Sequence, residues 1–250
     1  MKNQFNAICP IYFQHKNSNK IEHIGSGIFF QIKKDVFLLT VSHIIDLLNE
    51  GDLLVPCKDS ISPIEGSYSF LALKSDKTRN DDMEEMGYFK LKNDFAKKIH
   101  NEFLFLTSED ILINNIFDFD LYTFSGFPFR KSRQKNNVAS TEMYNYSGVL
   151  VTQVDYEKLN FDPSIHIVVK YNRLKTVNQE GIRFIPPLPH GISGGGIFAW
   201  PQLSKEGIIP ENRQIIGIAH TYREREHLLI GTKIIAFVQA IMINNPSIEL

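Results

Sequence analysis

The sequence predicts an all-β protein with few helices. Short apolar segments recur along the whole chain of 250 residues, each bounded by polar or glycine-containing turns. Few of these segments are long enough to form a helix. One stretch that is long enough is 234–243, whose Ile, Ala, Phe, Val and Met residues are consistent with a helix.

The predicted strands fall into two sets of six. The first set is expected at about 7–14, 22–32, 36–42, 52–57, 67–74 and 86–92. The second set is expected at about 120–125, 146–153, 164–171, 194–200, 213–221 and 227–233. A further helix is expected within 94–105, and a connecting segment follows the loop at 107–110. We therefore divide the chain into two β units, residues 1–112 and 113–250.

The composition fits a well-packed globular protein without a strong electrostatic partner. Hydrophobic residues make up 43% of the chain, and its formal net charge is −1. Such a balance offers no field that would gather nucleic acid or an anionic membrane. No apolar run approaches the roughly 20 residues that span a bilayer, and the basic run at 130–135 is expected to be a solvated loop. Neither nucleic acid nor membrane is an expected partner.

The cysteines and the N-terminal residues favour a cytoplasmic location. Residues 1–7 contain no apolar core followed by a small-residue cleavage site, so no secretory signal is visible there. Cys9 and Cys57 are the two cysteines of the chain, and we interpret them as reduced thiols rather than as a disulfide framework. The Asn-, Ile- and Lys-rich usage favours a bacterial or phage-related origin.

The segment Gly191–Gly196 surrounds Ser193 with glycines, just ahead of an apolar stretch. Glycine removes the Cβ that would block a substrate carbonyl and lets backbone N–H groups turn toward an oxyanion. Alone, the cluster is also compatible with a turn or bulge. The elbow of α/β-hydrolases is disfavoured because only 57 residues follow Ser193. A phosphate-binding loop is disfavoured because no Lys-Ser or Lys-Thr pair follows.

Two further motifs precede this segment in the chain. The apolar strand at 36–42 ends in Leu39-Thr40-Val41-Ser42-His43, and Gly25-Ser26-Gly27-Ile28 lies upstream of it. Together with Gly191-Ile192-Ser193-Gly194-Gly195, these motifs resemble, in type and order, those of the trypsin/chymotrypsin-like serine proteases. The residues from Tyr122 to Pro128 resemble the first strand of the second barrel in that family.

The resemblance implies the chymotrypsin-like fold, with two six-stranded antiparallel β-barrels and a C-terminal helix. The N-terminal barrel would carry His43, and the C-terminal barrel would carry Ser193. It implies a serine endopeptidase that cleaves polypeptide substrates through an acyl-enzyme, with Ser193 as nucleophile and His43 as base. The backbone N–H groups of Gly191 and Ser193 would form the oxyanion hole. No metal or organic cofactor is expected, since no Cys or His cluster has zinc-site spacing.

The carboxylate that orients the imidazole is less clearly marked. Glu85 stands at the head of Met86-Gly87-Tyr88-Phe89-Lys90-Leu91, where the family usually has Asp, so we predict Glu85 as the third catalytic residue. Asp82 and Asp81 are the alternatives. A third interpretation is that these acids form only a solvated loop.

The resemblance places Pro187, Leu188 and His190 beside the substrate pocket, with His220 on the strand along its wall. No acid stands where trypsin-like enzymes bind Arg or Lys. His220 lies one residue beyond the histidine that relatives cutting after Glu or Gln carry. An offset of one turns a strand side chain to the other face unless a bulge intervenes. A preference for substrates with an acidic or amide side chain before the cleaved bond would therefore require a β-bulge at this point of the strand.

Ile192 occupies the position at which digestive relatives have an aspartate that pairs with a newly cut N-terminus. That activation cannot operate here. The chain is expected either to fold directly into an active form or to depend on a regulatory protein partner or ligand that reshapes residues 181–192.

Two other functions stay open at this point. One is a protease-fold binding or sensor module in which Glu85 does not engage His43. The other is an esterase or peptidase of a different fold.

Overall fold

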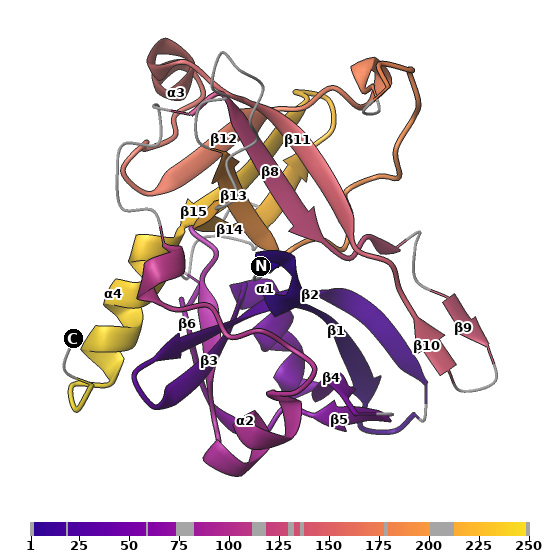
Figure 1. Cartoon of the computed structure of the whole chain (residues 1–250), viewed down its shortest axis with the longest axis vertical. Helices are drawn as coiled ribbons and strands as arrows, with labels where there is room; N and C mark the ends of the chain where they lie inside the picture. Colours follow the sequence, from indigo (N-terminus) through magenta and orange to yellow (C-terminus); the bar gives the residue numbers. More distant parts are fainter. Residues whose placement is uncertain are drawn as a thin grey trace.

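A computed structural model describes residues 3–18, 20–58, 60–73, 83–111, 119–129, 133–135, 138–177, 180–200 and 213–248, with the backbone alone at 133–135 and 138–140. Two β units lie one above the other in Figure 1, the N-terminal unit at the bottom and the C-terminal unit at the top. Helices are few and short. The predicted all-β class is confirmed.

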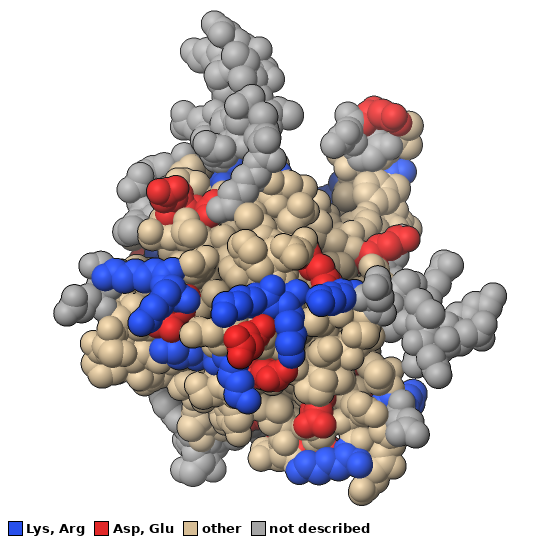
Figure 2. Space-filling view, turned by 60° about the horizontal axis from the view of Figure 1, so that its bottom comes forward, with Lys and Arg blue, Asp and Glu red and all other residues tan. Residues whose placement is uncertain are grey.

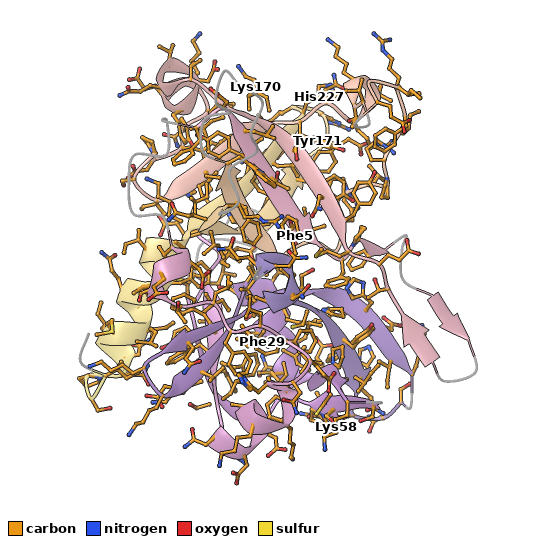
Figure 3. All side chains as sticks on the ribbon, in the orientation of Figure 1. Phe5, Phe29, Lys58, Lys170, Tyr171 and His227 are labelled. Carbon is orange, nitrogen blue, oxygen red and sulfur yellow. The ribbon has the colours of Figure 1, made fainter. Side chains whose placement is uncertain are left out.

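The N-terminal unit is one curled antiparallel sheet. Its strands are β1 (Ile8–His15), β2 (Ile21–Ile32), β3 (Asp35–Thr40), β4 (Gly51–Cys57), β5 (Ser60–Pro63), β6 (Gly66–Phe70) and β7 (Gly87–Leu91), in the spatial order β5-β4-β1-β2-β3-β7-β6. Phe29, Phe30 and Phe37 are almost completely buried in its core. Figure 3 shows Phe29 in the middle of this unit.

This sheet differs from the six-stranded barrel that was predicted, because it has seven strands and its two edge strands, β5 and β6, are not paired with each other. The strand that the sequence analysis missed is β5. Its four residues, Ser-Ile-Ser-Pro, alternate serine with an apolar residue, so the pattern contains no apolar run. The strand forms instead as the returning arm of a hairpin, with Cys57 opposite Ser60.

The C-terminal unit is a closed antiparallel barrel of six strands, as predicted. Its strands are β8 (Leu121–Gly126), β11 (Tyr144–Leu150), β12 (His166–Lys170), β13 (Gly196–Trp200), β14 (Gln214–Arg223) and β15 (Leu228–Lys233), in the order β11-β12-β15-β14-β13-β8. Tyr122, Phe124 and Tyr146 fill its core. A separate hairpin of β9 (Arg133–Lys135) and β10 (Val138–Ser140) was not predicted.

The described helices are short. They are α1 (Ser42–Ile45), α2 (Asn93–Ile99), α3 (Gln153–Lys158) and α4 (Ile234–Asn244), with 3-10 turns η1 (Gln4–Ala7), η2 (Asp46–Asn49), η4 (Ser108–Asp110) and η7 (Arg173–Lys175). The helices α2 and α4 occur where the sequence predicted them, whereas α3, which begins with a Thr152–Asp155 capping box, was missed. No described helix has the length and apolar character to cross a bilayer.

Apolar contacts made by elements of both units join the N-terminal sheet to the C-terminal barrel. Helix α4 follows the C-terminal barrel, yet its buried residues Ile234, Phe237 and Ile241 belong to the core cluster of the N-terminal unit. On the N-terminal side, the ring of Phe5 packs edge-on against Phe198 of β13, with 5.2 Å between ring centroids. Figure 3 shows Phe5 between the units. The boundary at residue 112 stays a prediction, since residues 112–118 lie outside the described part.

The charged side chains that Figure 2 shows on the underside of the N-terminal unit are of both signs. Lys90 pairs with Asp35 at 3.4 Å, and Lys98 pairs with Glu65 at 3.3 Å. Cations and carboxylates are interspersed on this face, so it presents no uniform positive field.

Candidate active site

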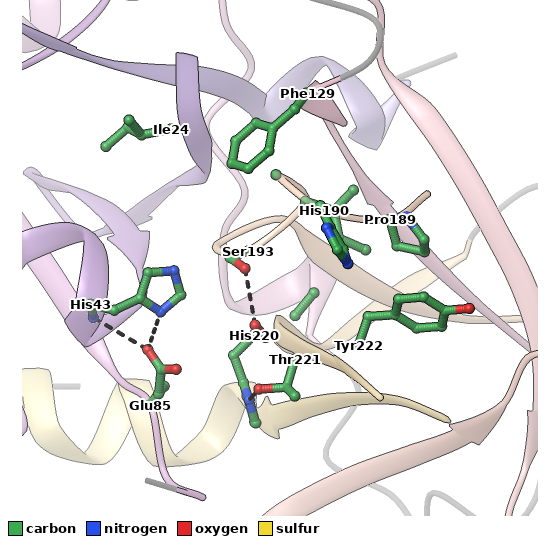
Figure 4. Close-up of a pocket in the computed structure, with 13 residues that line it drawn as sticks. Ile24, His43, Glu85, Phe129, Pro189, His190, Ser193, His220, Thr221 and Tyr222 are labelled. Carbon is green, nitrogen blue, oxygen red and sulfur yellow. Dashed lines mark hydrogen bonds and ion pairs between the residues drawn. The ribbon is translucent and has the colours of Figure 1, made fainter. Parts of the chain in front are cut away.

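His43 is held at the junction between β3 and α1. The strand is buried up to Thr40, and the helix begins at Ser42. Ile44 and Ile45 are almost fully buried, which fixes the helical turn against the core, while the His43 side chain is 35% exposed. The apolar strand followed by a short helical turn thus presents the imidazole at the surface of a cavity (Figure 4).

Glu85 lies directly behind His43. Its Oε2 contacts His43 Nδ1 and also accepts a hydrogen bond from the His43 backbone N–H at 3.2 Å. Because a carboxylate can only accept, Nδ1 carries the proton of a neutral ring, and Nε2 is left as the acceptor. The carboxylate is 5% exposed. Of the candidate acids, the structure brings Glu85 to His43, whereas Asp81 and Asp82 lie outside the described residues.

Ser42 ties the Glu85 segment to α1. Its hydroxyl donates to the Met86 carbonyl at 2.9 Å and accepts from the Met86 N–H at 3.2 Å. Ser42, which precedes His43, is therefore hydrogen-bonded to Met86, which follows Glu85. The sequence analysis did not single out this contact, although Ser42 is part of the quoted histidine motif.

Ser193 stands in a loop whose glycines adopt backbone conformations that other residues avoid. Gly191 has φ +99°, and Gly194 has φ +85°. The Ile192 N–H donates to the Pro189 carbonyl at 3.1 Å, which closes a turn with Gly191 in its third position, as a type II turn requires. A Cβ at Gly194 would lie 1.9 Å from the Ser26 carbonyl oxygen. Both glycines are therefore required by the geometry of the loop.

Ser26 of β2 holds this loop from the other β unit. Its N–H donates to the Ser193 carbonyl at 2.7 Å, and its hydroxyl donates to the Gly191 carbonyl at 3.2 Å. The same hydroxyl accepts from the Phe127 N–H at 2.9 Å. The buried Ser26 thus binds both sides of Ile192 and the end of β8, which explains a serine between two glycines on β2.

The turn directs two backbone N–H groups away from protein acceptors. The Phe129 N–H donates to the His190 carbonyl at 2.8 Å. In a trans peptide the C=O and the following N–H point in opposite directions, so the Gly191 N–H points away from Phe129. Neither the Gly191 N–H nor the Ser193 N–H donates to another described residue. These two N–H groups are therefore without a protein acceptor among the described residues.

The Ser193 hydroxyl is hydrogen-bonded to an acceptor other than His43. It donates to the His220 carbonyl at 2.9 Å, as the dashed line in Figure 4 shows. Ser193 and His43 line the same cavity, but within the described part of the chain no hydrogen bond joins their side chains. Hydrogen bonds between catalytic groups are often loose before substrate is bound.

The cavity has a volume of about 450 Å³. It is lined by Ile24, His43, Glu85, Phe129, Pro189, His190, Gly191, Ile192, Ser193, Ala219, His220, Thr221 and Tyr222. Among the four predicted pocket residues, His190 and His220 are in this lining, whereas Pro187 and Leu188 are not. The Leu188 carbonyl instead accepts a hydrogen bond from the Tyr146 hydroxyl at 3.4 Å. Sequence reasoning missed Ile24, Phe129 and Tyr222, which no motif marks.

His220 is the extra residue of a β-bulge. The pairing of β14 with β15 shifts between Ala219 and Thr221. The imidazole is 6% exposed, and its Nδ1 lies 2.8 Å from the Thr221 hydroxyl oxygen. Burial, with smaller effects of His166 and His43, lowers the pKa of His220 to about 3. At His220, the backbone carbonyl accepts the hydrogen bond from Ser193 at the cavity, whereas the imidazole ring is neutral and buried.

Among the residues that the structure describes, no group of three or more His, Cys, Asp or Glu side chains is arranged to hold a metal ion.

No family model and no curated protein sequence matches this chain. Solved structures do match. A Glu endopeptidase aligns with 97% of this chain and 91% of its own, at 12% identity and a TM-score of 0.56. The VesB protease of Vibrio cholerae aligns with 96% of this chain, at 12% identity and a TM-score of 0.55, and the chain covers 64% of that protein. The protein has the chymotrypsin-like fold.

The buried histidines make stability dependent on pH. Burial lowers the pKa of His23 from 6.5 to about 4, and that of His220 to about 3. Both rings take up protons in the unfolded chain below pH 6.5 but stay neutral in the folded protein. The free energy of unfolding should therefore fall from pH 6.5 to 4, by up to about 1.4 kcal/mol per pH unit for each histidine.

Urea unfolding at several pH values measures this decline. The matched variant is His23→Gln, whose amide keeps a donor for the Gly25 carbonyl, which lies 2.8 Å from His23 Nε2. This variant should show a shallower decline, and an equally steep one would contradict the assignment.

Proposed function

We propose that the protein is a serine endopeptidase that cleaves polypeptides through an acyl-enzyme. The observation that carries the proposal is the pairing of Glu85 with His43 beside the cavity that Ser193 also lines. Such an acid and imidazole next to a hydroxyl form the arrangement of a nucleophile, a base and an orienting group. The chymotrypsin-like fold and the two free N–H groups support the same chemistry.

In the proposed reaction, Ser193 Oγ attacks the carbonyl carbon of a peptide bond while His43 Nε2 takes the hydroxyl proton. The oxyanion that forms receives hydrogen bonds from the Gly191 and Ser193 N–H groups, each contributing about 3–4 kcal/mol to transition-state stabilisation. His43 then gives its proton to the leaving amine as the C–N bond breaks. Water, with His43 again as base, hydrolyses the acyl-enzyme. Glu85 keeps the Nδ1 proton in place throughout.

The hydrogen bond from Ser193 to the His220 carbonyl is compatible with this reaction. A neutral hydrogen bond contributes only about 1 kcal/mol net. Turning the hydroxyl toward His43 therefore costs little compared with the stabilisation that the oxyanion donors supply. The hydrogen bond from Ser193 to the His220 carbonyl is therefore not an obstacle to the proposed reaction.

The proposed substrate is a polypeptide, and the proposal requires no metal or cofactor. The buried, neutral ring of His220 is a poor partner for an acidic side chain, so we do not extend the preference of the Glu endopeptidase to this protein. The free, buried cysteines Cys9 and Cys57 support a cytoplasmic location. A regulatory protein partner would act on residues 181–192, which lead into the glycine loop.

A binding or sensor module is the second candidate. The observation that favours it is the Ser193 hydroxyl, which donates to the His220 carbonyl rather than to the imidazole. The predictions below separate the two functions.

We expect a fluorophosphonate probe to label Ser193 in the purified chain with Met1 intact. Ile192 is buried at 5% exposure, so packing rather than a charge pair shapes the loop, and no maturation by cleavage is needed. Mass spectrometry of the labelled protein and sequencing of its N-terminus provide the measurement, with Ser193→Ala as the unlabelled control. Labelling confined to N-terminally shortened molecules would refute the claim, and no labelling at all would favour the sensor module.

The variants Ser193→Ala and His43→Ala should each lower kcat on a cleaved peptide by about 10⁴-fold or more, because residues that act as one unit fail together. Thermal unfolding should show that both variants stay folded. The double variant should lose little beyond either single variant. Losses that add in kcat/KM would argue against a shared role.

Glu85→Gln should lower kcat by about 10³- to 10⁴-fold, because an amide can hold the imidazole in the wrong tautomer. The exposed neighbour provides a matched control, Glu84→Gln, which should leave kcat within about twofold. Asp82→Asn tests the alternative acid. If that variant shows the large loss and Glu85→Gln does not, the assignment of the acid is wrong.

A further inference from the structure

We propose that His166 and Thr232, on the C-terminal barrel, are positioning residues that set Glu85 against His43. Neither residue contacts the imidazole of His43, and both act through the backbone of the segment Met83–Glu85. The catalytic consequence rests on the proposed function, whereas the placement of the acid can be measured without it.

Two hydrogen bonds join the barrel to this segment. His166 Nε2 donates to the Met83 carbonyl at 2.9 Å, and the Thr232 hydroxyl donates to the Glu85 carbonyl at 3.4 Å. His166 on β12 and Thr232 on β15 are direct partners across the strand pair. Directly opposed residues in an antiparallel pair place their side chains on the same face. The pairing register thus aims both groups at the segment that carries the acid.

The barrel provides a rigid base for these groups. His166 is 4% exposed and Thr232 is 2% exposed. The Asp162 N–H lies 3.2 Å from His166 Nδ1, and the Tyr156 hydroxyl donates to the His166 carbonyl at 3.2 Å. Because the Met83 carbonyl can only accept, Nε2 donates to it. His166 Nδ1 lies 3.2 Å from the Asp162 nitrogen and 3.1 Å from the Asp162 carbonyl oxygen, so both ring nitrogens have polar partners.

The side chain of Met83 adds an apolar contact to the same barrel. It packs against a buried cluster composed of Val151, Tyr156, Phe161, Val168, Leu228 and Ile230. On the other side, the Ser42 hydroxyl binds the backbone of Met86, and the carboxylate of Glu85 reaches His43. The acid therefore lies between two anchors, one in each β unit. The barrel that carries Ser193 also helps to hold the acid of the opposite unit.

A shift of the segment by about 1 Å is enough to lower turnover substantially, because catalytic groups must hold their alignment. His166→Phe keeps an aromatic ring beside Phe161, whose centroid lies 5.2 Å away, but removes the donor. Thr232→Val removes the hydroxyl at nearly constant volume. The conservative variants His166→Gln and Thr232→Ser restore a donor at each position.

The experiment compares these four variants with Thr123→Val in the full chain. Thr123 is a buried β8 residue whose hydroxyl binds Ser147 and Trp200, away from Glu85, so its variant controls for loss of a buried hydroxyl in the same barrel. The first readout is the NMR resonance of the His43 Nδ1–H proton, which reports the bond to Glu85. The second is kcat and KM on a cleaved peptide.

We expect His166→Phe and Thr232→Val to move the Nδ1–H resonance and to lower kcat by about 10- to 100-fold with KM nearly unchanged. His166→Gln and Thr232→Ser should recover both readouts, and Thr123→Val should lower the melting temperature without moving them. An unmoved resonance in His166→Phe and Thr232→Val would overturn the proposal. If His166→Phe does not fold, Thr232→Val and Thr232→Ser decide by the same readouts.

The two proposals fail in different ways. A chain without peptidase activity in which the resonance moves would support the positioning role and refute the proposed function. An active enzyme in which both readouts are unaffected would support the function and overturn the positioning role.

Discussion

The hydrogen bonds between Ser26 and the loop around Ser193 are the contact on which the rest of the site depends. Through them, β2 of one unit holds the carbonyls of Gly191 and Ser193 in the other. With these carbonyls occupied and the His190 carbonyl bound by Phe129, the turn keeps one orientation. The free N–H groups, the serine and the cavity all follow from that orientation.

The candidate triad is consequently a property of the interface rather than of either unit. His43 and Glu85 come from the N-terminal sheet, and Ser193 comes from the C-terminal barrel. The acid is itself held from both sides, by Ser42 and by the pair His166 and Thr232. Buried polar contacts of this kind are sensitive to geometry, since an unsatisfied partner costs about 1–3 kcal/mol. The alignment of these groups therefore depends on how the two units pack against each other.

The chain shares its fold with the Glu endopeptidase structure at 12% identity, so the fold places strict demands on few positions. Positions such as Gly194, where a Cβ would meet the Ser26 carbonyl, admit little change. Most core positions need only an apolar side chain of suitable volume.

Local patterns in the sequence predicted the all-β class, because apolar alternation and glycine-dependent turns are local properties. The resemblance of its motifs to the trypsin/chymotrypsin-like serine proteases predicted the C-terminal barrel, the terminal helix and the candidate residues His43, Glu85 and Ser193. The sequence also left Glu85 in competition with Asp81 and Asp82, since a loop between strands has no period that fixes which carboxylate turns inward. Tertiary structure decided the open N-terminal sheet, the bulge at His220 and the contacts of His166 and Thr232. Those features depend on strand pairing and on docking of the two units, which bring together residues far apart in the chain.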